Sequence, residues 1–251
     1  MLYDSHAHLD LMSEEELKNA LFSAEECRVK KIISCSTSFA SNETNLVLSK
    51  EHPQILAAIG LYPLDAIELS PPEIEKTFCF FKEKIKKATA IGEVGLDFKY
   101  STIKEDLEKQ ILIFSKFIEL SIESKKPLIV HSRFAQKQVL ELLREKKATL
   151  VLLHSFTDSQ KLMKQSTDAG YFISCGMNVL QNPETQKNIK EFPLENLLLE
   201  TDSPIRFNNV KATPCEIKSI AQKISELKEI TLKEVEEQTE KNFKKLFGSL
   251  T

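Results

Sequence analysis

The chain has 251 residues, of which 41% are hydrophobic and 28% are charged, an ordinary balance for a globular protein that buries a substantial core. Its formal net charge of -3 gives no general attraction to nucleic acid or to an anionic membrane, so any affinity for phosphate must be local. No apolar run approaches the length of a membrane span, and Met1 leads into a predicted strand rather than a targeting segment.

The cysteines indicate a reducing compartment. There are five of them, widely spaced, mostly inside apolar segments and without a CxxC pair. They are Cys27, Cys35, Cys79, Cys175 and Cys215. We therefore expect reduced, buried cysteines in a cytoplasmic protein.

Short apolar segments alternate with amphipathic segments along the chain. Strands are predicted at 1–4, 31–36, 55–60, 89–93, 127–131, 149–154, 171–175 and 197–202. Helices are predicted at 13–29, 42–50, 71–87, 104–124, 158–169, 184–190, 214–227 and 232–246, and one more ends near 146. No linker or low-complexity tract divides the chain, so residues 1–251 are expected to form a single domain.

This alternation predicts an α/β fold, a (β/α)₈ barrel of the TIM type. Strands separated by helices pair in parallel, and the length is close to the roughly 250 residues typical of that barrel. An open doubly wound sheet is the alternative. It usually carries a Gly-rich phosphate loop after an early strand, and the sequence has none.

Histidines and carboxylates gather at the ends of the predicted strands. In a barrel these ends meet at one face, where sites are built. The residues are His6, His8, Glu93, His131, His154 and Asp202. Each alone has a plainer explanation, such as a polar strand end, an imidazole bonded to the backbone, or a turn carboxylate at Asp202. Taken together, a shared site explains better than coincidence why all six fall on the same side.

Six such ligands are too many for one catalytic metal that keeps an open position. They suit two divalent ions about 3.5–4 Å apart, with Glu93 as the bridge because it comes from the middle of the strand order. The ligands accept Mg²⁺, Mn²⁺ or Zn²⁺. Two such ions less two carboxylates leave a site charge of about +2, which attracts an anionic substrate.

Five ordered motifs resemble the TatD family of metal-dependent deoxyribonucleases, within the amidohydrolase-type barrels. They are Asp4-Ser5-His6-Ala7-His8-Leu9-Asp10, Gly92-Glu93-Val94-Gly95-Leu96-Asp97, His131-Ser132-Arg133, His154-Ser155-Phe156 and Glu200-Thr201-Asp202-Ser203-Pro204. Residues 242–247 also resemble the closing helix of the family.

The resemblance implies a role for each motif residue. His6 and His8 hold one metal, His131 and His154 hold the other, and Glu93 bridges them. Asp202 binds the first metal, orients the nucleophilic water and takes its proton. Asp202 and Glu93 are thus the candidate catalytic residues. The implied reaction is hydrolysis of a DNA phosphodiester by a two-metal activated water, as a 3′-5′ exonuclease on single strands.

Departures from the family pattern concern the substrate region rather than the ligands. Tyr62 in Gly60-Leu61-Tyr62-Pro63 stands where the family usually has a histidine, and it can stack on a base, bond a phosphate or only fill space. Arg133 and Arg206 are candidate phosphate contacts, and a salt bridge at the barrel rim explains them equally well.

Two other functions stay open at this point. One is a barrel hydrolase acting on a cyclic amide or a small phosphoester; the glutamate at position 93, where many amidohydrolase relatives carry a carbamylated lysine, favours the nuclease by resemblance. The other is a non-catalytic binding protein that kept the fold, and the complete ligand set counts against it. A monomer is expected, with DNA or another phosphodiester as substrate and no membrane partner.

Overall fold

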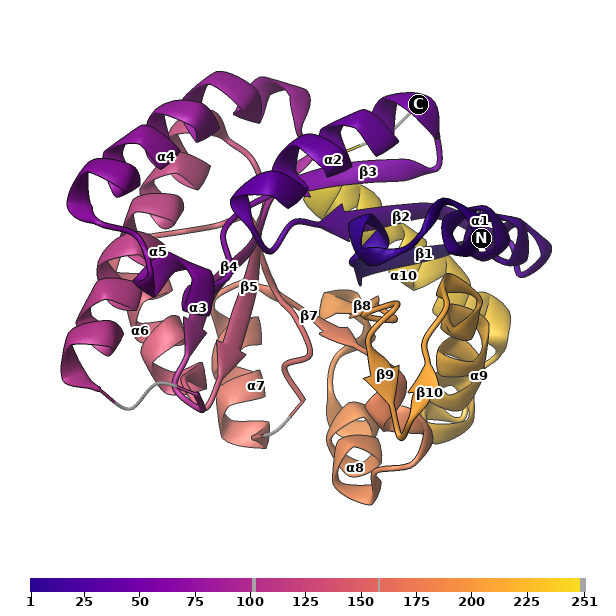
Figure 1. Ribbon diagram of the computed structural model, residues 1–251. Coiled ribbons are helices and arrows are strands. Elements are labelled where there is room, and N and C mark those ends of the chain that lie inside the picture. The colour runs from indigo at the N-terminus through magenta and orange to yellow at the C-terminus, as the bar shows by residue number, and fades with distance from the viewer. Residues whose placement is uncertain (101–102, 158, 249–251) are drawn as a thin grey trace.

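The computed structural model describes residues 1–100, 103–157 and 159–248 and contains the predicted barrel. Eight parallel strands follow one another around it in chain order, β1 to β8 (Figure 1). Their bounds are β1 Leu2–Ala7, β2 Val29–Cys35, β3 Ile55–Ile59, β4 Ala90–Asp97, β5 Leu128–Arg133, β6 Val151–Leu153, β7 Phe172–Cys175 and β8 Leu197–Leu199. Each strand pairs with the next in parallel, so the prediction of fold class is confirmed.

Helices connect the strands and cover the outside of the barrel (Figure 1). Their bounds are α1 Glu14–Glu26, α2 Phe39–Glu51, α3 Pro63–Ile67, α4 Pro71–Lys84, α5 Lys104–Ser124, α6 Gln136–Glu145, α7 Gln160–Asp168, α8 Pro183–Glu191, α9 Ile217–Lys228 and α10 Leu232–Phe247. Capping boxes begin several of them; Ser13 and Glu16 bond each other's backbone at the start of α1. The expected start of α7 at Asp158 lies outside the described residues.

The sequence prediction missed a short helix and a hairpin. The short helix α3 follows β3, and a two-stranded hairpin, β9 Arg206–Phe207 with β10 Val210–Lys211, follows the last barrel strand. Asn208 and Asn209 form the turn of the hairpin with φ of 48° and 66°. Two consecutive asparagines are a known signal for such a left-handed turn.

Two apolar clusters hold the barrel together. One lies between the strands and the outer helices and includes Phe81, Phe114 and Phe117. The other fills the barrel interior and joins inward-facing strand residues to the last helix. There the Phe243 ring of α10 packs 4.6 Å from that of Tyr3, so α10 closes the end of the barrel opposite the strands' carboxyl ends.

Side chains close the seam between β1 and β8. Ser5 Oγ donates to the Leu199 carbonyl at 2.8 Å, and the Asp4 carboxylate accepts from both the backbone N–H and the hydroxyl of Thr201, at 3.0 and 2.5 Å. These bonds tie the segment after β8 to the strand that carries His6. The barrel is therefore nearly closed at the point where two of the predicted site motifs meet.

The cysteine prediction is wrong for one pair. Cys27, at the end of α1, forms a disulfide with Cys215, in the turn that precedes α9, across 188 residues of sequence. Only the packing of α1 against this turn brings them together, with 5.4 Å between their Cα atoms. Cys35 and Cys175 are free and buried as expected, whereas Cys79 is free and exposed on α4.

No helix among the described residues is long and apolar enough to cross a membrane.

Candidate metal centre

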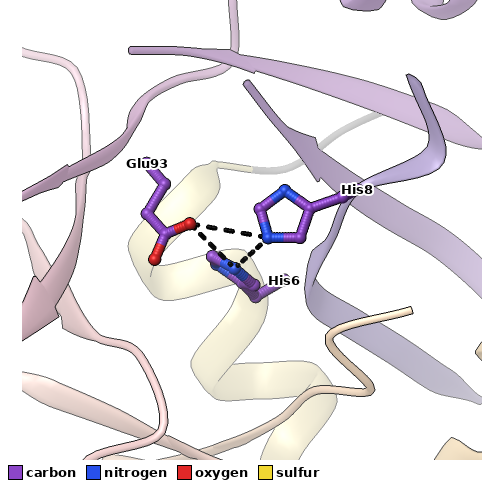
Figure 2. A group of neighbouring side chains, drawn as sticks. All are labelled: His6, His8 and Glu93. Atoms are coloured by element: carbon purple, nitrogen blue, oxygen red, sulfur yellow. Dashed lines mark hydrogen bonds and ion pairs between the residues drawn. The ribbon is translucent and has the colours of Figure 1, made fainter. Parts of the chain in front are cut away.

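All six predicted side chains converge at the face where the strands' carboxyl ends meet. Three overlapping groups place their ligand atoms within 4.8 Å of one another: His6 with His8 and Glu93; His6 with His154 and Asp202; Glu93 with His131 and His154. Figure 2 shows the first group, with both imidazoles turned toward the Glu93 carboxylate. The six belong to one centre and not to separate regions.

β1 delivers the two histidines as their spacing predicted, although the strand reaches Ala7 and not only Asp4. The Nε2 atoms of His6 and His8 lie 3.1 Å apart. Asp202 Oδ1 lies 3.4 Å from Nε2 of His6 and 3.2 Å from that of His8. These three residues form one half of the centre.

Glu93 lies between the two pairs of histidines. Its Oε2 is 3.7 Å from His6 Nε2 and 3.5 Å from His8 Nε2. Its Oε1 is 2.8 Å from Nδ1 of His131 and 3.4 Å from Nε2 of His154. Glu93 is not at a strand end as predicted, because β4 continues to Asp97. The β4–β5 pairing shifts register between Ile91 and Val94, and such irregularities re-aim side chains.

Acceptors behind three of the histidines fix which nitrogen faces the centre. His8 Nδ1 lies 2.8 Å from the Cys35 carbonyl, and His154 Nδ1 lies 3.1 Å from Glu200 Oε2. His131 is reversed, with Nε2 3.1 Å from Asp97 Oδ2 and Nδ1 toward Glu93. A ring N–H donated outward leaves the lone pair of the other nitrogen pointing inward, as a metal ligand requires.

Burial and neighbouring charges shift the pKa values of the histidines in the centre. Burial disfavours the charged form of His8, but the hydrogen bond to Asp202 and the charges of Asp202 and Glu93 outweigh it and raise the pKa of His8 to about 9. Burial likewise opposes the charge on His154, yet Glu200 and then Glu93 raise its pKa to about 10. Burial and the neighbouring His154 lower the pKa of His6.

Both carboxylates of the centre are held ionised. Burial favours their neutral forms, but the hydrogen bond to His131 and the charges of the nearby histidines hold the pKa of Glu93 below its usual range. Hydrogen bonds to His6 and His8 outweigh burial in the same way and hold the pKa of Asp202 well below its usual range.

Backbone hydrogen bonds between β1 and the segment after β8 fix the position of Asp202. Its backbone N–H donates to the His6 carbonyl at 3.0 Å, and its φ of 57° is left-handed. The next residue, Ser203, accepts from the His8 N–H at 2.6 Å. The Asp202 side chain is 35% exposed, whereas His6, His8 and Glu93 are buried, so Asp202 is the carboxylate of the centre that solvent reaches.

The three residues predicted at the substrate region have different surroundings. Tyr62 OH donates to Asp97 Oδ2 at 2.8 Å and lies 3.2 Å from His131 Nε2, so it belongs to the hydrogen-bond shell of a histidine. Arg133 is exposed at the end of β5. Arg206 Nη1 donates to the Asn209 carbonyl at 2.8 Å in the hairpin, which lines a cavity of about 80 Å³ beside Asp202.

The sequence prediction assigned no role to the carboxylates behind the histidines. Asp97 and Glu200 are both buried and bond His131 and His154. A signal was present, since Glu200 lies two residues before Asp202 and Asp97 follows Glu93 on the same strand. Carboxylates near a ligand histidine commonly orient its ring.

The donor set fits divalent cations. Two donors each about 2.1 Å from one ion lie about 3.0 Å apart at a right angle and about 3.4 Å apart at the tetrahedral angle. The separations of 3.1 to 3.7 Å among His6, His8, Glu93 Oε2 and Asp202 fall close to this range. His131 Nδ1 and Glu93 Oε1 lie 2.8 Å apart, a separation that suits a cation that both atoms face.

Comparison with known proteins identifies the family. The model of the TatD related DNase family matches residues 3–248.

The chain belongs to the TatD related DNase family.

The chain is similar over almost its whole length to relatives in this family. It is 32% identical to the Bacillus subtilis protein YabD, described as an uncharacterized metal-dependent hydrolase, over 98% of this chain and 99% of that one. It is 30% identical to the human deoxyribonuclease TATDN3 over 99% of this chain and 95% of that one. The crystal structure of YjjV, a TatD homologue from Escherichia coli, has the same fold, with a TM-score of 0.89 at 24% identity over 99% of this chain and 98% of that one.

The expected class of enzyme is thereby confirmed. The chain is a TatD-type hydrolase of ester bonds that depends on a divalent metal.

Proposed function

We propose that this protein hydrolyses DNA phosphodiester bonds with two divalent cations held by the six converging side chains. The observation that carries the proposal is that the two carboxylate oxygens of Glu93 face different pairs of histidines. Its Oε2 faces His6 and His8, and its Oε1 faces His131 and His154. A carboxylate whose two oxygens face separate pairs of ligands is suited to bridge two ions.

His6, His8 and Asp202 would hold one ion, and His131 and His154 the other. When bound, the two ions would lower the pKa of a water toward neutrality and neutralise charge on the phosphate. Mg²⁺, Mn²⁺ and Zn²⁺ all suit histidine and carboxylate ligands.

Asp202 is the proposed general base. It is ionised, it lies on the exposed side of the centre, and its backbone is fixed by bonds to β1. A water within hydrogen-bond reach of its carboxylate can be oriented and can pass its proton to it. Glu93, buried and bonded to His131, holds the ligand pairs in place rather than moving a proton.

The proposed substrate is DNA, cut from the 3′ end of single strands. The name of the human relative TATDN3 supports a DNA substrate. The charge of the centre supports an anion, because two divalent ions less Glu93 and Asp202 leave about +2 on a chain whose net charge is -3. Arg133, exposed two residues beyond His131, can bind a phosphate through its planar fork.

We further propose that residues 1–251 act as one domain, as a monomer, in the cytoplasm. Cys35, Cys79 and Cys175 are free thiols, which supports a reducing compartment, and the disulfide between Cys27 and Cys215 is the pair that tests it. Trapping thiols with an alkylating reagent at cell lysis decides the compartment. An alkylated pair supports the cytoplasm, and an unreacted, disulfide-bonded pair contradicts it.

The test of the proposed function uses Asp202→Asn, which keeps the shape of the side chain but removes its charge. A 5′-labelled single-stranded oligonucleotide incubated with Mg²⁺, Mn²⁺ or Zn²⁺ should be shortened stepwise by the wild type. Asp202→Asn should be slower by about 10²–10⁴-fold, the usual contribution of a general base. The control is Glu141→Gln on the exposed face of α6, which should cleave like the wild type.

A folded wild type that binds metal and cleaves no phosphodiester would overturn the proposal. A panel of small esters and cyclic amides, run in parallel, would then reveal a hydrolase of another bond.

A further inference from the structure

Four exposed residues lie at the rim of the barrel and are here called the rim platform: Lys99, Tyr100, Arg133 and Phe134. Arg133 ends β5, and the other three residues follow the carboxyl ends of the neighbouring strands β4 and β5, on the face that carries the metal centre. Tyr100 is 60% exposed and Phe134 is 70% exposed. Two large aromatic rings thus lie in solvent on adjacent loops.

Basic groups flank the Tyr100 ring. The Lys99 ammonium lies 5.1 Å from the ring centroid and the Arg133 guanidinium lies 5.2 Å from it. Contacts between cations and rings are weak at exposed sites, so they orient the ring without occupying it permanently. The rim platform therefore combines aromatic faces with positive charge on a chain that is acidic as a whole.

The backbone of the rim platform is bonded to the shell of the metal centre. Lys99 N–H donates to Asp97 Oδ1 at 2.9 Å, and the other oxygen of that carboxylate bonds His131. Phe98 N–H donates to the Arg133 carbonyl at 2.9 Å, which ties the two loops together. Arg133 lies two residues beyond His131 on the same strand, a separation of about 7 Å.

Phe134 combines an unfavourable backbone conformation with an exposed ring that does not pack in the core. Its φ of 56° is left-handed, a conformation that bulky side chains rarely adopt. The same residue leaves its ring in water, where a polar residue would serve the fold better. Strained residues of this kind are found preferentially at ligand-binding and active sites.

We propose that the rim platform stacks an unpaired base of single-stranded DNA while the adjoining phosphate lies at the metal centre. The proposal rests on the function proposed above and adds the reason for a single-strand preference. Tyr100 and Phe134 accept any base on its face, which is tolerant of sequence. Lys99 and Arg133 neutralise the backbone phosphates beside it. A base-paired strand keeps its faces stacked inside the duplex and cannot use the rings.

Binding without catalysis provides the test. Metal-loaded wild type and variants are titrated against a fluorescein-labelled twelve-nucleotide single strand with phosphorothioate linkages that resist cleavage, and the dissociation constant is read from fluorescence anisotropy. Tyr100→Ala and Phe134→Ala should each weaken binding about tenfold, while Tyr100→Phe and Phe134→Tyr should bind like the wild type. The matched control is Phe22→Ala, because Phe22 is 66% exposed on the outer face of α1, away from this rim.

The outcomes separate this proposal from the proposed function. Tyr100→Ala and Phe134→Ala that bind the single strand no worse than Phe22→Ala overturn the rim platform. So does a wild type that binds no oligonucleotide, or an equal loss of affinity for a blunt duplex. The proposed function is judged separately by metal-dependent hydrolysis of bis(p-nitrophenyl) phosphate, a diester without bases, by the wild type.

Discussion

Replacing Glu200 with glutamine tests how the hydrogen-bond shell supports the metal centre. Glu200 is buried, its Oε2 lies 3.1 Å from His154 Nδ1, and Ser174 Oγ donates to the same oxygen at 2.5 Å. Glutamine has the same size and retains one acceptor oxygen. The substitution therefore removes the negative charge behind His154 with little change in packing.

The expected effect is a loss of metal affinity. Loss of an outer-shell partner of a ligand histidine typically costs 10–100-fold, equivalent to about 1.4–2.7 kcal/mol. The value of a hydrogen bond to a charged group, about 1.5–3 kcal/mol, leads independently to the same range. The number of protons released on metal binding should change together with the metal affinity. Because Glu200 raises the pKa of His154 to about 10, Glu200→Gln should lower that pKa and reduce the protons released when metal binds.

Competition with a chelating dye at pH 7.5 measures the affinity, and calorimetry in buffers of different ionisation enthalpy measures the proton release. Glu141→Gln on α6 is the matched control, since this exposed residue pairs with Lys137 at 3.7 Å on the same helix. A merely structural Glu200 would lower the melting temperature and leave the affinity of the folded protein within twofold of wild type. That result would refute the reasoning.

Three further predictions concern the barrel and its titration. Gly95→Ala should destabilise the fold by about 3 kcal/mol or more in urea unfolding, because φ is 147° and a Cβ would lie 2.0 Å from the His131 carbonyl oxygen; a variant as stable as wild type would contradict this. Phe243→Ala should cost about 3–5 kcal/mol in the same assay, since it empties a fully buried site at the closed end of the barrel, and a loss under 1 kcal/mol would show that the site collapses freely. Metal-free protein should lose thermal stability as pH rises from 6.5 toward 9 to 10, because the pKa values of His8 (about 9) and His154 (about 10) lie above the value of 6.5 expected on unfolding. Their contribution is full below pH 6.5 and disappears above the folded values, so a flat melting temperature over this range, in chelator, would show that the shifts are absent.

Much of the fold was readable from local patterns. Alternation of short apolar runs with amphipathic segments predicts parallel strands covered by helices, and eight such units predict a barrel. Ser13 and Glu16 mark the start of α1 by their own hydrogen bonds, without help from distant residues. The hairpin at Asn208 and Asn209 was missed although its signal is equally local.

The pairing of Cys27 with Cys215 was beyond reach, because nothing near either residue reports a partner 188 positions away.

For the metal centre, the residue types near the ends of the strands could be predicted without the fold, since they depend on order along the chain alone. It identified His6, His8, Glu93, His131, His154 and Asp202 as one set, and the structure brings their ligand atoms together. Which atom of each side chain faces the centre could not be predicted, because it depends on contacts made in the folded barrel. The orientations of the His8, His131 and His154 rings depend on hydrogen-bond acceptors outside their own strands. These acceptors are the Cys35 carbonyl, Asp97 and Glu200. The position of Asp202 depends on its backbone hydrogen bond to His6 in β1. Such contacts join residues far apart in sequence, and closure of the barrel is the physical event that creates them.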